Sequence, residues 1–513
     1  MPGELVGTVH EIAPNTAHPS AESPVARAPQ SPALNGAATR VVRNSTLNLA
    51  TQGLYSALNL LLVYVLAGLG TERFGRFYWF FALILFFQIF WELGATTILT
   101  RRVVQAPDEW RETLADAAGL FTLIALCSLG TFLCLGAWWW ADAELFMCSA
   151  AAGVACAAMQ VQRFSAAVFQ AFELFRYENF GKLLQIVLLT SVAAALVRLH
   201  LANLAGVMWL LAASHVAAAV YMMAALQRRW HRLTWRLHLS RIKDWFAESG
   251  PLALGDMARG LSAQLDTVLM GRLQPAAAVG IYSMAYRPLG PVYWLPRVVM
   301  QAAFPSFARL ASEDHQALGR AFSSSLRLMW LISLPMALCV SAYAGPVVAI
   351  LAGPEFAAAA VPMRILAWIV SLSFLSFQFR FVLAAVGKAQ AYVRLAVAVL
   401  LLEACLQLAL IPRWGYLGAC AGLGIGELAF AFGGLALCLR AGLGTIEWRP
   451  LAGGALGAAV MGAVLWGAGG RGLFLLSAAA VVGLALYAGV CLWSRALRWT
   501  EVRHLGESLA GLM

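Results

Sequence analysis

The sequence predicts an all-α polytopic membrane protein with about 14 transmembrane helices, on the basis of three observations. Apolar stretches of about 20 residues, long enough to span a ~30 Å hydrocarbon core, recur from Ser45 to Ser494. Hydrophobic residues make up 61% of the 513 residues and charged ones only 12%, about half the charged share of a soluble domain. The connections leave no room for a soluble catalytic domain. Because lipid offers backbone groups no hydrogen bonds, each stretch must be helical.

The predicted spans follow one another with short connections. They cover approximately residues 45–69, 77–99, 114–136, 145–172, 180–198, 203–226, 250–271, 288–308, 323–343, 361–386, 391–411, 416–439, 450–467 and 473–494. With alternate assignment of connections, about 24 Lys and Arg residues fall on the side of the amino terminus and about 8 on the other. The positive-inside rule therefore predicts a cytoplasmic amino terminus, and the even number of spans predicts a cytoplasmic carboxyl terminus.

Two segments outside the spans have a distinct composition. Residues 1–38 hold six prolines and no apolar core of a signal peptide, which predicts a disordered cytoplasmic tail. Residues 228–248 connect the sixth and seventh spans. There Leu239, Ile242 and Trp245 or Phe246 share one helical face opposite a basic one. This pattern predicts an amphipathic linker that lies on the inner leaflet.

Several functional classes are disfavoured by composition. The net charge is +11, but the basic residues are dispersed between spans, so no nucleic-acid partner is predicted. The nine cysteines lie in apolar spans without a CxxC motif and the eight histidines are scattered, so neither a metal site nor a disulfide framework is expected. The run from Gly422 to Gly426 lies inside an apolar span, where glycines indicate close helix packing rather than nucleotide binding.

A weak internal repeat divides the chain. Leu69–Phe77 after the first span and Leu273–Tyr282 after the seventh share a leucine, a short polar turn and an apolar-Gly-x-aromatic opening. Two units entering the membrane in the same orientation would be parallel repeats. The expected units are 39–227 and 249–440, followed by two extra helices and a cytoplasmic tail at 441–513. The alternative is that any short outer turn favours a glycine and an interfacial aromatic residue.

Several arginines lie within predicted spans, where an unpartnered charge costs several kcal/mol. The four cavity candidates among them are Arg163, Arg259, Arg297 and Arg380. A guanidinium matches phosphate and carboxylate oxygens with two hydrogen bonds and stays charged. The four arginines are therefore predicted to line a cationic cavity that binds an anionic substrate. The alternatives are that Arg163 pairs with an acid across a helix interface and that Arg380 extends to the membrane surface.

Among the acids within spans, five are the candidates for ion coupling: Asp256, Asp266, Glu92, Glu403 and Glu427. Asp256, Arg259 and Asp266 share one face of the seventh span, which we expect to face the cavity. A carboxylate there could take up and release a proton or sodium as access alternates. A structural Asp–Arg pair is the alternative for this face, and burial against polar donors is the alternative for Glu403 and Glu427.

The eighth span contains Pro288, Pro291 and Pro296. Each proline removes a helical hydrogen bond and clashes with the preceding turn, so this span is predicted to be kinked or partly unwound. Arg297 directly follows one of these positions. The span is therefore our candidate for a gating helix.

Short runs between residues 43 and 440 keep a common order and spacing. They are Leu265–Gly271, Val279–Arg287, Phe304–Leu310, Leu334–Pro335, Gly353–Phe356, Ala385–Lys388 and Ile411–Ala419. Together they resemble the oligosaccharide flippase family of the multidrug/oligosaccharidyl-lipid/polysaccharide exporter superfamily. The resemblance implies a MATE-like fold, in which two six-helix bundles form a V-shaped arrangement and an extra pair of helices is appended.

The resemblance also implies a function. Members of that family move polyprenyl-pyrophosphate-linked oligosaccharide repeat units from the inner to the outer leaflet by alternating access. Such a protein would lie in the bacterial cytoplasmic membrane and serve the synthesis of lipopolysaccharide or exopolysaccharide. Its partners would be the lipid-linked oligosaccharide, membrane lipids, and the polymerase and export machinery. No cofactor is expected beyond a coupled proton or sodium ion.

Two other classes are weighed against this expectation. A multidrug cation antiporter of the same fold would need an acidic, aromatic cavity, whereas the predicted cavity carries arginines. A membrane polysaccharide polymerase or ligase would need a sizeable outer loop with catalytic groups, but the outer turns are short. We therefore expect a transporter rather than an enzyme.

Overall fold

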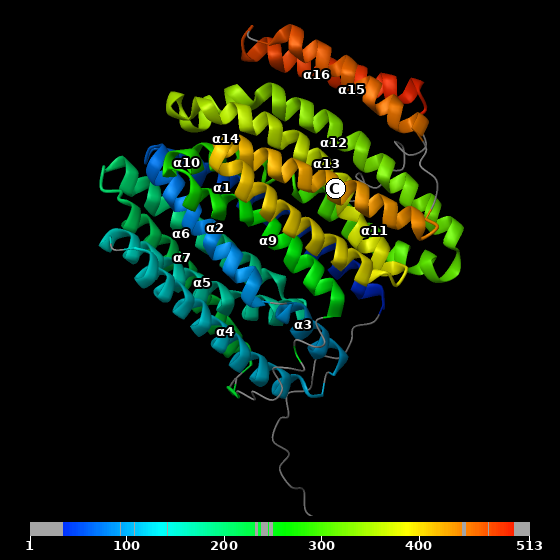
Figure 1. Cartoon of the computed structure of the whole chain (residues 1–513). Coiled ribbons are helices and arrows are strands. Elements are labelled where there is room, and N and C mark those ends of the chain that lie inside the picture. The colour runs from blue at the N-terminus through cyan, green and yellow to red at the C-terminus, as the bar shows by residue number, and fades with distance from the viewer. Residues whose placement is uncertain are drawn as a thin grey trace, which may run out of the picture.

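The chain is almost entirely helical in a computed structural model (Figure 1). The structure describes residues 34–92, 94–106, 108–140, 142–230, 234–236, 245, 250–443, 448–469 and 471–496. Within these ranges every regular element is an α-helix or a short 3₁₀ helix. This agrees with the predicted fold class, and it follows from the length and apolar character of the segments.

The first group of helices precedes residue 230. It comprises α1 (Leu34–Ala67), α2 (Thr71–Glu92), the short α3 (Ala95–Gln105), α4 (Trp110–Trp139), α5 (Ala143–Ala171), α6 (Phe175–Arg198) and α7 (Leu204–Arg229). Helix α5 packs between α4 and α7, and α1 lies along α6. Asn203 begins α7 by accepting a hydrogen bond from the backbone N–H of Gly206, which satisfies one free donor of the first turn.

The second group follows residue 249. It comprises α9 (Gly250–Leu273), α10 (Ala276–Tyr286), the 3₁₀ helix η1 (Arg287–Leu289), α11 (Trp294–Glu313), α12 (His315–Ala352), η2 (Pro354–Ala359), α13 (Ala360–Ala385) and α14 (Ala389–Arg440). Asp314 caps α12, and its hydrogen bond from the backbone N–H of Ala317 holds the pKa of this carboxyl below its usual value. Helices α15 (Trp448–Ala468) and α16 (Leu473–Trp493) form a hairpin that packs on α12, at the edge of the molecule in Figure 1.

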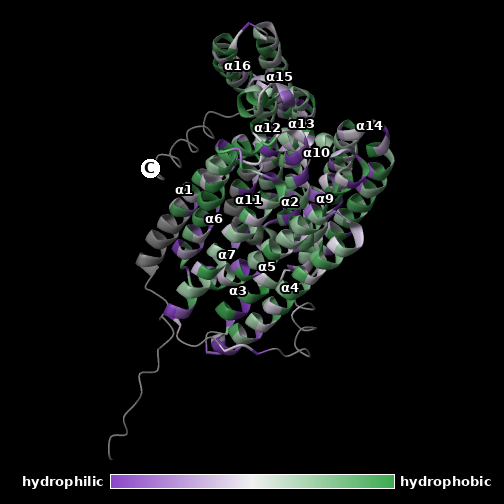
Figure 2. Ribbon diagram, turned by 90° about the vertical axis from the view of Figure 1, so that its left-hand side faces the viewer, coloured by the Kyte–Doolittle hydropathy of each residue, from purple (hydrophilic) through white to green (hydrophobic). Residues whose placement is uncertain are grey.

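The helices account for the fourteen predicted crossings. Eleven described helices are long and apolar enough to span a membrane. Helix α14 contains two of the expected spans, joined at Gly415, where a φ of 56° interrupts the helix after Pro412. Helix α9 and the interrupted α10–α11 segment supply the remaining crossings. Figure 2 shows the hydrophobic residues covering most of the helices, with hydrophilic ones among α2, α9 and α10.

Three predicted boundaries were wrong. The second span begins at Thr71 rather than residue 77, and the eighth crossing begins at Ala276 rather than residue 288. Helix α2 includes a polar first turn that the apolar pattern excludes. Helix α10 is apolar, but η1 at Arg287–Leu289 separates it from the rest of the crossing. Helix α1 begins at Leu34, so residues 34–38 do not belong to a disordered tail. The rest of that tail, most of the predicted linker and residues 497–513 lie outside the described residues.

Backbone atoms of α2 and α10 make a close contact between the two groups. A Cβ atom added at Gly75 would lie 1.9 Å from the carbonyl oxygen of Ala276, and one added at Gly280 would lie 2.2 Å from that of Thr71. Beside them, the backbone N–H of Thr71 donates to Glu355 at 2.8 Å. We call this the corner contact. The two turns assigned to the repeat therefore lie on one face of the protein, as parallel repeats require.

Candidate functional site

Two adjoining cavities lie between the two groups of helices. One has a volume of about 370 Å³ and the other of about 500 Å³. Both are lined by Gln52, Tyr55, Met159, Gln185 and His215. These shared side chains make the two cavities neighbouring parts of one space. We call the smaller one the aromatic chamber and the larger one the polar chamber.

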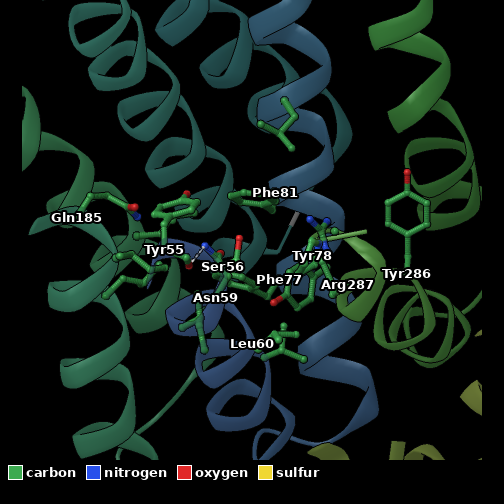
Figure 3. Close-up of a pocket in the computed structure, with 18 of the residues that line it drawn as sticks. Tyr55, Ser56, Asn59, Leu60, Phe77, Tyr78, Phe81, Gln185, Tyr286 and Arg287 are labelled. Atoms are coloured by element: carbon green, nitrogen blue, oxygen red, sulfur yellow. Dashed lines mark hydrogen bonds between the residues drawn. The ribbon is translucent and has the colours of Figure 1, made fainter. Parts of the chain in front are cut away.

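The aromatic chamber is lined mainly by rings from α1, α2 and the end of α10. Its aromatic residues are Tyr55, Phe77, Tyr78, Phe81 and Tyr286. Ser56, Asn59 and Gln185 add hydroxyl and amide groups to the wall. Figure 3 shows Gln185 on the side of the chamber opposite Arg287 and Tyr286. The chamber thus combines flat apolar faces with a few polar groups, as binding pockets for small ligands do.

Among the described residues, Arg287 carries the only formal charge on the wall of the aromatic chamber. Its guanidinium carbon lies 4.4 Å from the ring centre of Tyr78 and 5.1 Å from that of Phe81. Its Nε atom is buried without a hydrogen-bond partner among the described residues. The ring faces hold the cation in place, because an aromatic face attracts positive charge. Its hydrogen-bond donors therefore remain available for an anionic ligand.

The position of Arg287 follows from the local break in the eighth crossing. Helix α10 ends at Tyr286, the chain continues as η1, and α11 starts only at Trp294. Pro288 and Pro291 lie in the interruption and cannot donate backbone hydrogen bonds. The predicted unwinding of this crossing is therefore present, although its centre lies before Arg297.

The polar chamber contains two ion pairs and one further cation. Arg163 from α5 pairs with Glu92 at the end of α2. Lys182 pairs with Glu178 one turn earlier on α6, with its Nζ 2.6 Å from the carboxylate oxygen. Arg297 from α11 completes the set. Among the described residues, no ion-pair partner approaches Arg297.

The charges on the two chamber walls do not balance. Four cationic side chains line them, Arg163, Lys182, Arg287 and Arg297, against the two carboxylates Glu92 and Glu178. Since charge inside a membrane protein is costly, an excess of two cations favours an anionic ligand. Guanidinium groups bind phosphate and carboxylate oxygens through paired hydrogen bonds.

A second polar group lies inside the C-terminal helices, which we call the buried cluster. It consists of Arg259, Ser262, Glu403, Gln407 and Glu427, from α9 and α14. Arg259 donates to Glu427 at 2.8 Å, and the Ser262 hydroxyl donates to Glu403. One oxygen of each glutamate and both polar atoms of Gln407 have no hydrogen-bond partner among the described residues. The cluster thus has one more carboxylate than it has guanidinium groups.

Two further acids of α9 have partners on neighbouring helices. Asp256 pairs with Arg380 on α13 at 2.6 Å and accepts a hydrogen bond from Tyr392 at 3.4 Å. Asp266 accepts from the Tyr282 hydroxyl and from the backbone N–H of Thr267. Asp266 is almost fully buried, whereas Asp256 and Arg380 each expose 40% of their side chains.

The structure divides the residues proposed from sequence into two sets. Arg163, Arg297 and Glu92 line the polar chamber. The others line neither chamber: Arg259, Arg380, Asp256, Asp266, Glu403 and Glu427. Asp256, Arg259 and Asp266 line neither of these two chambers, and the expectation that they face a substrate cavity stays a prediction. Spacing places them on one face of α9, but that face packs against α14, α13 and α10 because their partners lie there.

Of the three prolines, Pro291 lines the aromatic chamber, Pro288 lies in η1 and Pro296 lies in the first turn of α11. A proline in the first turn is compatible with a helix, so Pro296 marks no break. A gating role for the three stays a prediction.

Sequence reasoning missed Arg287, Lys182 and Glu178. Arg287 was assigned to a connection because the eighth span was taken to begin at residue 288. Its position between Tyr286 and Pro288 could have placed it at a helix break. Glu178 was excluded because the fifth span was taken to begin at residue 180, and Lys182 lies just inside that limit but was not chosen, although their spacing of four predicts a pair on one helical face.

Comparison with known families extends this description. The family model described as "Polysaccharide biosynthesis protein" matches residues 66–361, which is more than half of the chain. The chain belongs to this family. The resemblance read from the sequence is thereby confirmed at the level of the family. This polysaccharide biosynthesis protein is a multi-pass membrane protein, since its helices and its structural neighbours agree.

Individual relatives share part of the sequence or the fold. The teichuronic acid biosynthesis protein TuaB of Bacillus subtilis (strain 168) is 27% identical over 145 residues, covering 28% of this chain and 30% of that relative. The match thus spans less than two thirds of TuaB. A structure of the lipid II flippase MurJ in an inward closed conformation has a TM-score of 0.69 at 10% identity, covering 86% of this chain and 97% of that one.

An inward-facing multidrug resistance transporter of the MATE family has a TM-score of 0.61 at 14% identity, covering 75% of this chain and 94% of that chain. At this level of identity, the structural neighbours establish the fold alone. The fold is therefore the one shared by MurJ and MATE transporters.

Proposed function

We propose that this protein is a flippase for polyprenyl-pyrophosphate-linked oligosaccharide repeat units. It moves them from the inner to the outer leaflet of the bacterial cytoplasmic membrane for surface polysaccharide synthesis. Both termini lie in the cytoplasm, and transport proceeds by alternating access. The protein is a transporter rather than an enzyme. Membership of a polysaccharide biosynthesis family and the MurJ/MATE fold support this assignment.

The observation that carries the proposal is the excess of cations in a cavity between the two groups of helices. A lipid-linked sugar bears a pyrophosphate, which cannot cross hydrocarbon without a compensating charge. Arg163, Lys182 and Arg297 of the polar chamber offer that charge. The rings of the aromatic chamber suit the apolar faces of sugar rings, while Asn59 and Gln185 can bond to hydroxyl groups.

The names of the related proteins are consistent with this substrate class. TuaB is a teichuronic acid biosynthesis protein, and MurJ is a lipid II flippase. A multidrug cation antiporter of the same fold is less compatible with the cavity, because four cationic side chains on its walls would repel a cationic drug.

Transport is coupled to a cation gradient through the buried cluster. Arg259 balances only one of the two carboxylates, Glu403 and Glu427, which leaves one uncompensated negative charge at membrane depth. A proton or a sodium ion would neutralise the cluster, and the oxygens of Glu403, Glu427 and Gln407 that lack partners could bind either. Asp256 and Asp266 are weaker candidates for coupling because each already has local partners.

The function is tested by deleting the gene and analysing lipid-linked intermediates on each leaflet. Loss of a surface polysaccharide with accumulation of the intermediate on the cytoplasmic leaflet is the expected result. Accumulation on the outer leaflet would instead place the protein in polymerisation or ligation. Unchanged intermediates and polymer would contradict the proposal.

Replacing Arg297 by Ala is expected to abolish flipping in proteoliposomes without preventing membrane insertion. Arg297 lines the polar chamber and forms no ion pair with any described residue, so its charge is available for the substrate. Lys should restore only part of the rate, because it provides a point charge instead of a planar pair of donors. Full activity of the Ala variant at normal protein level would remove Arg297 from the substrate path.

Replacing Glu403 by Gln is expected to abolish the dependence of flipping on an imposed proton or sodium gradient. Glutamine keeps the acceptor for the Ser262 hydroxyl but removes the negative charge that attracts the cation. Substrate binding should be retained. The comparison variant is Asp256→Asn, which breaks the ion pair with Arg380 and should lower thermal stability while leaving the gradient response intact. An unchanged gradient response in Glu403→Gln would exclude this carboxylate.

A further inference from the structure

We propose that Glu92 and Glu178 act as internal substitutes for the substrate's phosphate groups. In the empty transporter they hold Arg163 and Lys182, and phosphate oxygens displace them when substrate enters the polar chamber. This inference rests on the proposed function. It assigns to two acids a role in substrate exchange. Removing either acid should therefore tighten substrate binding, whereas removing a residue that binds the substrate would weaken it.

The arrangement of Arg163 and Glu92 fits such an exchange. Both side chains line the polar chamber, but 37% of the arginine side chain is exposed against 12% of the glutamate. One carboxylate oxygen of Glu92 accepts from Arg163, and the other accepts from the Thr96 hydroxyl at 2.5 Å. The carboxylate therefore has a neutral partner on the wall that can retain it when the guanidinium turns to a ligand.

Lys182 and Glu178 repeat this arrangement on α6. The lysine side chain is 47% exposed and the glutamate side chain 7%. Glu178 accepts from Lys182 with one oxygen and from the Gln170 amide with the other, at 3.0 Å. In both pairs the cationic side chain is exposed to the chamber. The carboxylate is more buried and accepts a second hydrogen bond from an uncharged donor.

Physical chemistry gives a reason for this design. An unpaired cation at membrane depth is costly, so a chamber of free arginines would destabilise the empty transporter. A carboxylate partner lowers that cost, and its replacement by a phosphate oxygen exchanges one charge-assisted hydrogen bond for a similar one. The net gain on binding is therefore modest. A transporter needs this property, because its site must release the substrate on the other side.

The order of binding follows from the same contacts. Arg297 lines the polar chamber and has no ion-pair partner among the described residues, so it can bind a phosphate without first breaking an ion pair. Arg163 and Lys182 then exchange partners. Glu92 belongs to α2, the helix that also forms the corner contact. Displacing it from Arg163 therefore breaks an ion pair that connects α2 to α5.

The test compares binding of a long-chain polyprenyl pyrophosphate in detergent micelles with flipping in proteoliposomes. Glu92→Gln is expected to bind the lipid about fivefold more tightly than the unaltered protein, because the cation no longer has a charged competitor. Its flipping should be slower because release is slower. Glu178→Gln should change both quantities in the same directions. Neutral polyprenol should bind all variants alike, since it has no phosphate.

Glu72→Gln is the matched control. Glu72 pairs with Arg76 on α2 at 2.6 Å with the spacing seen in the Glu178–Lys182 pair, but it lines neither chamber. Its removal should change neither affinity nor flipping. If Glu92→Gln is poorly folded, Glu92→Asp is the alternative. Its side chain is one methylene shorter, which weakens the contact with Arg163 and should also tighten lipid binding.

The possible results separate the inference from the function on which it rests. Weaker or unchanged lipid binding by both Glu92 variants would show that the acid positions Arg163, and would overturn the exchange. Failure of the unaltered protein to bind the pyrophosphate lipid would instead count against the proposed function. If Glu72→Gln bound the lipid more tightly to the same extent, the cause would be the change in net charge of the protein, and the exchange would be rejected.

Discussion

Replacing Arg287 by Ala is expected to reduce flipping about 100-fold or more. Among the described residues, Arg287 is the only formal charge on the wall of the aromatic chamber, and no acid forms an ion pair with it. Its guanidinium is held against Tyr78 and Phe81. Removing it leaves an anionic group of the substrate without a partner, which costs several kcal/mol in a cavity of low polarity.

The matched control is Arg272→Ala. The Arg272 guanidinium also lies over an aromatic ring, at 5.6 Å from the ring centre of Trp139, but it lines neither chamber. We expect this variant to keep its transport rate. Arg287→Lys should retain part of the rate and lose the directional hydrogen bonds. The measurement is the rate of flipping in proteoliposomes at equal protein content. An active Arg287→Ala variant would refute the role of Arg287.

Replacing Gly280 by Ala is expected to block the conformational cycle. The added methyl group would lie 2.2 Å from the carbonyl oxygen of Thr71, a distance that real Cβ atoms do not show, so α2 and α10 must separate. Overpacking of this kind costs about 1–3 kcal/mol. We therefore expect flipping to fall about tenfold or more, since this corner can no longer close.

Gly130→Ala provides the control for the methyl group itself. A Cβ atom at Gly130 in α4 meets no atom within 4 Å, so the change should raise helix stability slightly and leave transport intact. The measurement is the accessibility of a cysteine placed at Ala276 to a water-soluble thiol reagent. The labelling rate should increase in Gly280→Ala and stay constant in Gly130→Ala. Equal labelling in both backgrounds would argue against a tight corner contact.

The crossings could be predicted from the sequence because each depends on a local property. An apolar segment of sufficient length must be helical in lipid, whatever it packs against. The partner of a charged side chain depends instead on helices that are distant in sequence. Arg259 and Arg163 are alike in the sequence, yet Arg259 lies in the buried cluster with Glu427, and Arg163 lines the polar chamber with Glu92.

Arg287 shows a different limit. The sequence contains this arginine next to Pro288, but the apolar pattern predicts a span that begins only at residue 288. Arg287 was therefore expected to lie outside the membrane. Only the close packing of α10 on α2 brings the end of this short helix to the cavity. Irregular backbone at membrane depth is compatible with lipid only where it lines a cavity or is buried in protein. A break inside a predicted crossing is therefore itself an indicator of a binding site.

The interruption between α10 and α11 has a consequence for the breadth of substrates. Pro288 and Pro291 lack an N–H, so neither donates to a main-chain carbonyl group of the preceding turn; the carbonyl of Arg287, beside the aromatic chamber, accepts from the Gly290 N–H at 3.1 Å and has a second lone pair available. Sugar hydroxyls can donate to such carbonyls whatever side chains the neighbouring positions carry. Tolerance of different sugars would then be a property of the backbone, and preference among them a property of side chains such as Asn59 and Gln185. Relatives that carry different repeat units should accordingly differ on α1 and α6 while keeping the two prolines.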